Sequence, residues 1–428
     1  MTPTTINRVH GRRVYDSRGR PTVEAEVRLA SGVIGRGIAP AGASRGSREA
    51  IDLRDGGTRL GGYDVATAVA NVRGPLARAI FGMDALEQAE IDAKLIEVDG
   101  TPNKSKMGAN AMVAISLAVA QAAAAAHDMP LWMYLAGDGP VSLPLPEIQI
   151  FGGGAHAGRR IDIQDLMVMP LGAWTFDDAI TMVAEIYRAA GTLMQETGKL
   201  AGVADEGGYW PNFVSNEEAL EMTVRAIERA GCHPGSDAAI SLDIAASEFG
   251  RDGRYTLALD KRELDRDGMS EMLLHWLDKY PIVSIEDPFA EDDRVAWIEF
   301  NRAAGHRVQI IGDDYLTTNA ARIDEARIDD ACNAVLIKVN QAGTLTETKA
   351  ALDAGRAAGF ATIVSARSGE SEDTAIAHLA VGWNAGQLKV GSFARSERMA
   401  KWNEVLRIEE ALGADARFAG AAALARRK

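Results

Sequence analysis

Five charged residues in the second half of the chain stand at the ends of apolar, strand-like runs. They are Asp243, Glu286, Asp313, Lys338 and Lys389. Most of the intervals between them have the length of one strand plus one helix, which is the rhythm of a (β/α) barrel. In such barrels the carboxyl ends of the strands meet on one face, where active sites lie. We therefore predict that three carboxylates and two lysines share one pocket.

The three carboxylates, Asp243, Glu286 and Asp313, predict a metal site. Neighbouring carboxylates repel one another unless a cation neutralises them, and Mg²⁺ binds carboxylate, water and substrate oxygens. The alternative is that each carboxylate pairs with a lysine or arginine of the barrel.

Lys338 follows the apolar run Val335–Ile337 beside this site. A nearby cation and desolvation both disfavour an ammonium, so we expect a lowered pKa and a base that can remove a proton next to a carboxylate.

Two glycine-rich loops and one more strand end carry further polar side chains. Glu206 lies in one loop and can protonate a leaving hydroxyl, while His156 lies at the tip of the other, Gly152–Gly158. Arg367 and Ser368 follow a strand-like run and suit a phosphate group. The structural alternatives are a histidine that only packs and an arginine that forms a salt bridge at the rim.

The bulk properties indicate a soluble two-domain protein. The 428 residues divide into a small α+β capping domain, residues 1–135, and a (β/α)8-type barrel with the active site, residues 140–428. A formal net charge of −14 argues against nucleic-acid binding, which needs a positive surface. The two cysteines, Cys232 and Cys332, lack metal-ligand spacing, and no leader or membrane span is visible. We expect a cytoplasmic location.

The capping domain shows sheet and helix patterns in turn. Val23–Leu29 alternates apolar and polar residues, which predicts a half-exposed strand, and the segment from Gly32 to Gly37 leads through a hairpin into a second strand. A Gly/Ser loop, Pro40–Arg48, comes next. The stretch Ala118–His127 predicts a buried, alanine-rich helix. A long helix near Ser396–Leu412 is expected to close the chain.

With these motifs in view, the chain resembles the enolase family over nearly its whole length. The resemblance rests on segments spread along the sequence: Tyr15–Glu24, Gly42–Ser44, Gly153–Gly158, Asp205–Gly208, Ser284–Pro288, Gly312–Asp314, Lys338–Gln341, Arg367–Glu370 and Arg395–Arg398. Together, in this order, they are highly specific. The resemblance implies an enolase-type fold, a lyase that acts on 2-phosphoglycerate or phosphoenolpyruvate, and an enolate intermediate.

The same resemblance implies two Mg²⁺ sites. Asp243, Glu286 and Asp313 would hold the first ion, and Ser44 on the N-terminal loop would help to hold the second. Lys338 would be the base. A lysine base with one or two Mg²⁺ ions is the general arrangement of enolase-type sites.

The remaining roles also follow from the resemblance. Glu206 looks like the acid, and His156 like a loop residue that closes on the substrate. Contacts to the phosphate and carboxylate would come from Arg367, Ser368 and Lys389.

Several departures from the enolase pattern fall where ligands bind. Enolases have histidine where this chain has Ala366, glutamate where it has Asp165, threonine where it has Arg45, and asparagine where it has Arg20. In the histidine loop, N-G-G-S-H becomes Gly152–His156. We count Asp165 among the catalytic residues, and Ser44, Arg45 and Ala366 among the substrate-binding ones. The pattern predicts a specialised phosphonate-pathway substrate, as in carboxyphosphonoenolpyruvate synthases.

Three alternatives stay open. The chain could be an ordinary phosphopyruvate hydratase, a non-catalytic enolase-fold binding or structural protein, or a relative of mandelate racemase. Lys338 lies after the three carboxylates, as in enolase, which disfavours the last. The resemblance also implies a homodimer or higher homo-oligomer, in which Glu24 can pair with an arginine such as Arg407 across the interface.

Overall fold

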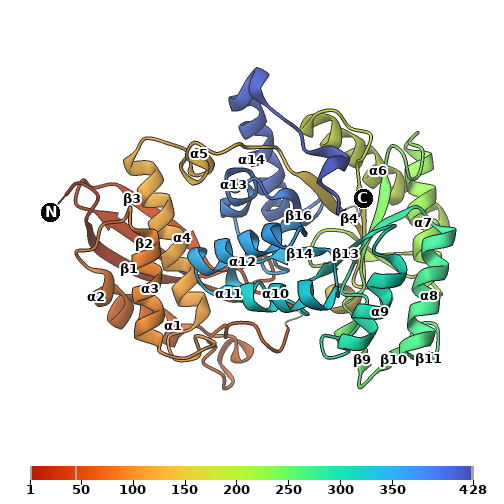
Figure 1. Ribbon diagram of the computed structural model, residues 1–428, viewed down its shortest axis with the longest axis horizontal. Coiled ribbons are helices and arrows are strands. Elements are labelled where there is room, and N and C mark those ends of the chain that lie inside the picture. Colours follow the sequence, from red (N-terminus) through yellow and green to blue (C-terminus); the bar gives the residue numbers. More distant parts are fainter. Residues whose placement is uncertain (1, 44–45, 426–428) are drawn as a thin grey trace.

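The computed structural model describes residues 2–43 and 46–425. The chain forms an N-terminal part of sheet and helices and a larger barrel. Figure 1 shows the first part, drawn in red and orange, beside the larger barrel. The predicted Ser44 and Arg45 lie outside the described residues. The fold class expected from the sequence is confirmed.

The N-terminal part is an antiparallel sheet covered by helices. Its strands are β1 (Ile6–Tyr15), β2 (Pro21–Leu29) and β3 (Ile34–Ile38), paired in the order β1–β2–β3. The alternation in β2 buries Val23, Ala25 and Val27 completely. The helical elements are η1 (Arg59–Gly62), α1 (Ala66–Asn71), η2 (Val72–Leu76), α2 (Ala77–Ile80), α3 (Gln88–Asp99), α4 (Ala109–Ala126) and α5 (Leu131–Ala136).

The alanine-rich helix α4 packs unusually close to the sheet. A methyl group at Gly35 would collide with the backbone of Ala118, and one at Gly37 would lie 2.6 Å from the carbonyl oxygen of Ala114. Helix α4 is long and apolar enough to cross a membrane, but 83% of it is buried inside the protein. The prediction of a buried core helix is therefore confirmed.

Eight strands close into the barrel. They are β4 (Leu145–Gly152), β5 (Asp165–Met169), β8 (Ala239–Asp243), β12 (Ile282–Glu286), β13 (Gln309–Gly312), β14 (Ala334–Ile337), β15 (Ala361–Ser365) and β16 (Gly386–Ser392). Strand β16 pairs with β4 and completes the ring. A regular strand–helix alternation would make every pair parallel, but β5 runs antiparallel to both β4 and β8. The cause is the loop of residues 153–164, which carries only a short helical turn and returns the chain directly beside β4.

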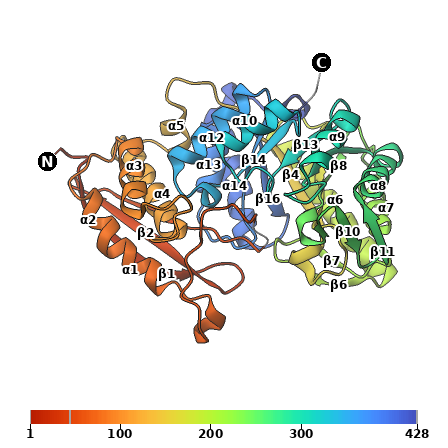
Figure 2. The ribbon, with the colours of Figure 1, turned by 60° about the horizontal axis from the view of Figure 1, so that its bottom comes forward.

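Helices surround the strands of the barrel, as the turned view in Figure 2 shows at right for α6 to α9. The barrel helices are α6 (Phe176–Thr197), α7 (Asn216–Arg229), α8 (Arg266–Lys279), α9 (Arg294–Ala304), α10 (Ala320–Asp329), α11 (Val339–Ala342), α12 (Leu345–Ala357), α13 (Ala375–Gly382) and α14 (Ser396–Leu412). The last of these matches the predicted terminal helix.

Short additional elements complete the barrel part. Strands β6 (Leu200–Val203) and β7 (Tyr209–Pro211) form a hairpin beside β4, and its turn carries Glu206. A small sheet contains β9 (Gly250–Arg251), β10 (Arg254–Leu257) and β11 (Arg262–Asp265). The short helical turns are η3 (Gly154–Ala157), η4 (Ala246–Glu248), η5 (Gly413–Asp415) and η6 (Gly420–Ala423).

The residues expected at a dimer interface have partners within this chain. Glu24 forms an ion pair with Arg12 of β1, and Arg407 pairs with Glu404 at 2.8 Å. The homodimer stays a prediction.

Candidate active site

The strand ends bring the predicted residues to one mouth of the barrel. Asp243 is the last residue of β8 and Glu286 the last of β12, while Asp313 and Lys338 directly follow β13 and β14. Lys389 lies within β16. One pocket is lined by His156, Gln164, Asp165, Glu206, Asp243, Lys338, Ser365, Ala366, Arg367, Ser368, Lys389 and Val390. It gathers every predicted site residue within the described ranges except Glu286 and Asp313, which contact its lysines.

Two lysines pair with the three carboxylates. The Nζ of Lys389 lies 2.9 Å from Asp243 Oδ2 and 2.8 Å from Glu286 Oε2. Lys338 forms a buried ion pair with Asp313. The alternative in which each carboxylate pairs with a barrel cation is therefore realised in the protein itself. These ion pairs do not exclude a metal site, because Lys389 engages only one oxygen each of Asp243 and Glu286.

The pKa of Lys338 differs from the sequence-based expectation. Burial lowers it, but the carboxylates around it, Asp313 first and then Glu286, together hold the pKa above its ordinary value. The prediction of a lowered pKa for Lys338 is therefore wrong when only protein groups surround it. That prediction assumed that the nearest strong charge would be a metal cation, whereas it is the Asp313 carboxylate.

The carboxylate cluster carries more negative charge than its lysines neutralise. Burial, with Asp243 as the next cause, raises the pKa of Glu286 well above its usual range. Burial lowers the pKa of Lys389, but Asp243 and Glu286 together raise it well above its ordinary value. An additional cation would relieve this imbalance.

Unpaired oxygens test whether these residues fit Mg²⁺. Asp243 Oδ1 and Glu286 Oε1 are buried and have no hydrogen-bond partner within the described residues. Buried polar atoms without a partner are costly, and carboxylate oxygens are the ligands that Mg²⁺ prefers. Both Asp313 oxygens are engaged, Oδ1 by Gln341 Nε2 at 2.8 Å and Oδ2 by Lys338. Two of the three predicted ligands thus fit an ion directly, and the third fits once Lys338 or Gln341 moves.

The closest groups of potential ligand atoms differ from the predicted triad. In residues 2–43 and 46–425, the sets whose atoms lie within 4.8 Å of one another are Asp287, Asp313 and Asp314, and His156, Asp165 and Glu206. Asp287 accepts hydrogen bonds from the backbone N–H groups of Asp313 and Asp314 at 2.9 and 2.8 Å. It therefore fixes the main chain that carries Asp313.

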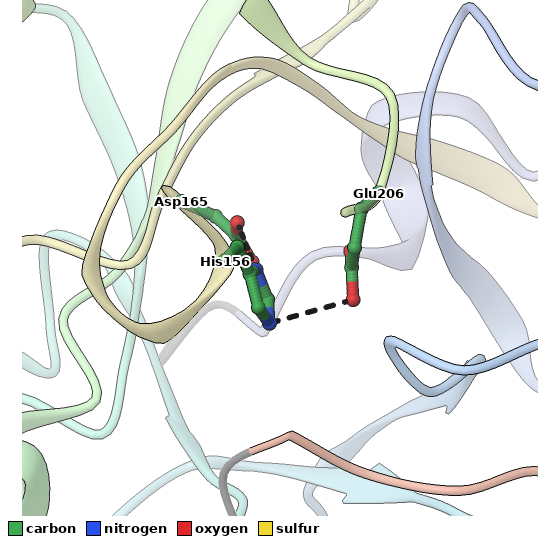
Figure 3. Close-up of side chains that lie close together, drawn as sticks. All are labelled: His156, Asp165 and Glu206. Atoms are coloured by element: carbon green, nitrogen blue, oxygen red, sulfur yellow. Dashed lines mark hydrogen bonds and ion pairs between the residues drawn. The ribbon is translucent and has the colours of Figure 1, made fainter. Parts of the chain in front are cut away.

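His156 lies between two carboxylates that line the same pocket (Figure 3). Its Nδ1 is 3.1 Å from Asp165 Oδ1, and its Nε2 is 3.7 Å from Glu206 Oε1 and 3.1 Å from Ser368 Oγ. Burial lowers the pKa of His156, but Glu206 and Asp165 raise it to about 9. Burial raises the pKa of Asp165, but His156 lowers it to about 2. The shorter aspartate thus reaches the histidine, which is an imidazolium at neutral pH.

Arg367 is buried, and its guanidinium does not lie at the rim. Its Nη1 donates to Glu49 Oε2 at 3.0 Å and to Asn340 Oδ1 at 2.9 Å. The neighbouring Ala366 also faces the pocket and is 6% exposed. The position where enolases have histidine therefore borders the pocket directly.

Sequence reasoning missed Glu49 and gave Gln341 no role. The predicted Gly/Ser loop ended at Arg48, one residue before Glu49, and Gln341 entered only as part of a matching segment. Both are polar residues next to predicted site segments. Polar residues at such places are too common in a sequence to single out these two.

The closed eight-stranded barrel, the capping sheet and a pocket of paired lysines and carboxylates define an enzyme of the barrel class with its site at the strand ends. The family model described as "Enolase, N-terminal domain" matches residues 6–135, and that described as "Enolase, C-terminal TIM barrel domain" matches residues 140–427. A protein named Enolase 1 from Desulfitobacterium hafniense is 50% identical over 416 residues, which cover 96% of this chain and 95% of that relative. The chain belongs to the enolase family and is a carbon–oxygen lyase.

Proposed function

We propose that this protein is a phosphopyruvate hydratase, which interconverts 2-phosphoglycerate and phosphoenolpyruvate. The observation that supports this most strongly is that Lys338 and Glu206 line one pocket together with Arg367 and Lys389. A base, an acid and two cations are the groups that this dehydration of a doubly anionic substrate requires. The relative named Enolase 1 supports the same activity.

In the dehydration direction, Lys338 removes the C2 proton and Glu206 protonates the departing C3 hydroxyl, so that water leaves. Arg367, Ser368 and Lys389 hold the phosphate and carboxylate. Asp243, Glu286 and Asp313 would hold Mg²⁺, which would supply positive charge next to the carboxylate of the substrate. With the charge of Asp313 neutralised in this way, Lys338 would lose the ion pair that keeps it protonated and could accept the C2 proton.

Other members of the site have supporting roles in this proposal. His156 and Asp165 form one wall, and the imidazolium orients Glu206 toward the hydroxyl. Ser44 helps to hold a second Mg²⁺, and Arg45 contributes to substrate binding. We also propose the division into residues 1–135 and 140–428, a cytoplasmic location, a homodimer and no nucleic-acid or membrane partner.

A specialised phosphonate substrate is the second candidate. It is favoured by one observation, that Ala366 borders the pocket where enolases have a larger, polar histidine. The comparisons name enolases and give no support to a phosphonate pathway. We therefore place the hydratase first.

Phosphorus NMR separates the two candidates. Purified protein is incubated with Mg²⁺ and 2-phosphoglycerate, with and without phosphonoformate or its nucleotide ester. Fast formation of phosphoenolpyruvate from 2-phosphoglycerate alone is the expected result. Little turnover alone, followed by a new carbon-bonded phosphorus product with the phosphonate, would instead support the second candidate.

A further inference from the structure

Glu49 reaches the candidate site from the N-terminal part of the chain. Its side chain is buried, with the residue 5% exposed, and its two carboxylate oxygens face the guanidinium of Arg367. Oε2 lies 3.0 Å from Nη1, and Oε1 lies 3.1 Å from Nη2. A two-point contact of this kind fixes the plane of a guanidinium as well as its position.

The same carboxylate also holds the loop that precedes it. Glu49 Oε1 accepts a hydrogen bond from the backbone N–H of Gly46 at 3.2 Å and another from Gln341 Nε2 at 3.2 Å. Gln341 Nε2 also donates to Asp313 Oδ1 at 2.8 Å. The Glu49 side chain therefore contacts both the loop after β3 and Arg367, and it is connected through Gln341 to the proposed metal ligand Asp313.

The backbone of Arg367 is held independently of Glu49. Its N–H donates to Glu370 Oε1 at 2.9 Å, and its carbonyl oxygen accepts from Arg398 Nη1 at 2.7 Å. The backbone is thus fixed by the barrel alone. The direction of the guanidinium depends on side-chain contacts, of which the two-point pair with Glu49 is the strongest type.

An anion that binds Arg367 must share the guanidinium with a carboxylate that is already buried there. Two negative groups beside one cation repel each other strongly where water is excluded. Glu49 therefore weakens the binding of a free anion and at the same time fixes the orientation of the Arg367 guanidinium.

We propose that Glu49 is a positioning residue that orients Arg367 toward the substrate phosphate and couples this orientation to the loop after β3, which it holds at Gly46. The proposal rests on the proposed function, in which Arg367 contacts phosphate. Glu49 itself touches no reacting atom. It lowers the affinity for phosphate in the ground state and contributes to turnover through the arginine.

The test compares Glu49→Gln with Glu291→Gln. Glu291 accepts hydrogen bonds from the backbone N–H of Ser47 at 3.2 Å, so among the described contacts it holds the same loop without reaching Arg367. For Glu49→Gln in the Mg²⁺-loaded full chain, we expect the Kd for inorganic phosphate, measured by calorimetry, to fall about tenfold. We expect kcat to fall at least about tenfold while KM decreases. Glu291→Gln should stay within about twofold of the wild type in all three quantities.

Two results would overturn the proposal. One is a phosphate affinity that is unchanged or weaker in Glu49→Gln. The other is an equal change in Kd, kcat and KM in Glu291→Gln, which would mean that Glu49 acts only by holding the loop. The phosphate measurement needs no turnover, so it remains decisive even if the wild type fails to dehydrate 2-phosphoglycerate and the proposed function is wrong.

Glu49→Asp separates charge from geometry and is the second variant if Glu49→Gln does not fold. It keeps the negative charge but shortens the reach, so we expect lower kcat with a phosphate Kd within about twofold of the wild type. Wild-type kcat in Glu49→Asp would contradict a positioning role.

Discussion

The two walls of the pocket differ in how they relate to the family pattern. One wall, the strand-end cluster, contains Asp243, Glu286, Asp313, Lys338 and Lys389, and each has the residue type that the enolase resemblance implies. The other, the loop wall, contains His156, Asp165 and Ala366, of which the last two depart from it. The cluster residues end, directly follow or lie within barrel strands, whereas in the loop wall Asp165 begins β5, Ala366 directly follows β15 and only His156 lies in a turn between strands.

This difference indicates which part of the site sets the chemistry and which part sets the choice of substrate. Proton removal and metal binding need fixed charges, and rigid strand ends supply them. The departing residues, Asp165 and Ala366, also lie at strand ends, but neither is a proposed metal ligand or the proposed base. A change of substrate within the same chemistry is therefore expected first at the loop wall.

The largest effect is expected from Lys338→Met, which removes the proposed base and keeps the side-chain volume. Loss of a general base lowers turnover by about 10²- to 10⁴-fold. Dehydration of 2-phosphoglycerate and exchange of its C2 proton with deuterated water are followed together by NMR. Lys349→Met, at an exposed lysine of α12, serves as the control. Proton exchange at the wild-type rate in Lys338→Met would show that Lys338 is not the base.

The loop wall is tested by the pH dependence of stability. The pKa of His156 is raised to about 9, so its ion pairs stabilise the folded state fully below the ordinary value of 6.5 and are lost as pH rises through about 9. We expect the free energy of unfolding in urea to fall by about 3 kcal/mol across this range, and His156→Gln to abolish that fall. The exposed His127 offers a control substitution, His127→Gln. A wild-type pH slope in His156→Gln would contradict the assignment.

Metal binding tests the strand-end cluster. Because an ion that binds only the folded state stabilises it, Mg²⁺ at 100 times its Kd should add about 2.7 kcal/mol. Asp243→Asn should lose most of this gain, while Asp353→Asn, at an exposed carboxylate, should keep it. Thermal unfolding with and without Mg²⁺ measures both. An undiminished response in Asp243→Asn would place the ion elsewhere.

The smallest effect is expected from Ala366→His, which restores the family residue to the loop wall. One added hydrogen bond to the substrate is worth about 1 kcal/mol, so dehydration of 2-phosphoglycerate should rise several-fold, up to about tenfold. Ala366→Leu adds bulk without a donor and should not raise the rate. If both variants leave kcat/KM unchanged, Ala366 does not discriminate between substrates.

Much of this arrangement could be predicted because barrel strands have a simple rule. An apolar run that ends in a charged residue places that residue at the barrel mouth, as found for Asp243 and Glu286. The buried α4 could be predicted for a similar reason, since continuous small apolar residues suit a core helix. In both cases local pattern and final position are linked by geometry.

The remainder depends on contacts between distant segments. Glu49 and Arg367 are 318 residues apart, and no local pattern links them. The reversed direction of β5 was missed because a strand has the same alternation in either direction. The raised pKa of Lys338 depends on the rotamer that brings it to Asp313, which sequence spacing does not specify.

The close contact between α4 and the N-terminal sheet constrains how this sequence can change over evolutionary time. No side chain larger than hydrogen fits at Gly35 or Gly37 unless the helix backbone recedes from the sheet. Most of the atoms in the way belong to the helix backbone at Ala114, Ala118 and Ala122, so no exchange of these alanine side chains can make room for a larger residue at either glycine. Both glycines should therefore be retained among distant relatives, and libraries that randomise Gly35 or Gly37 should yield few folded proteins with other residues there.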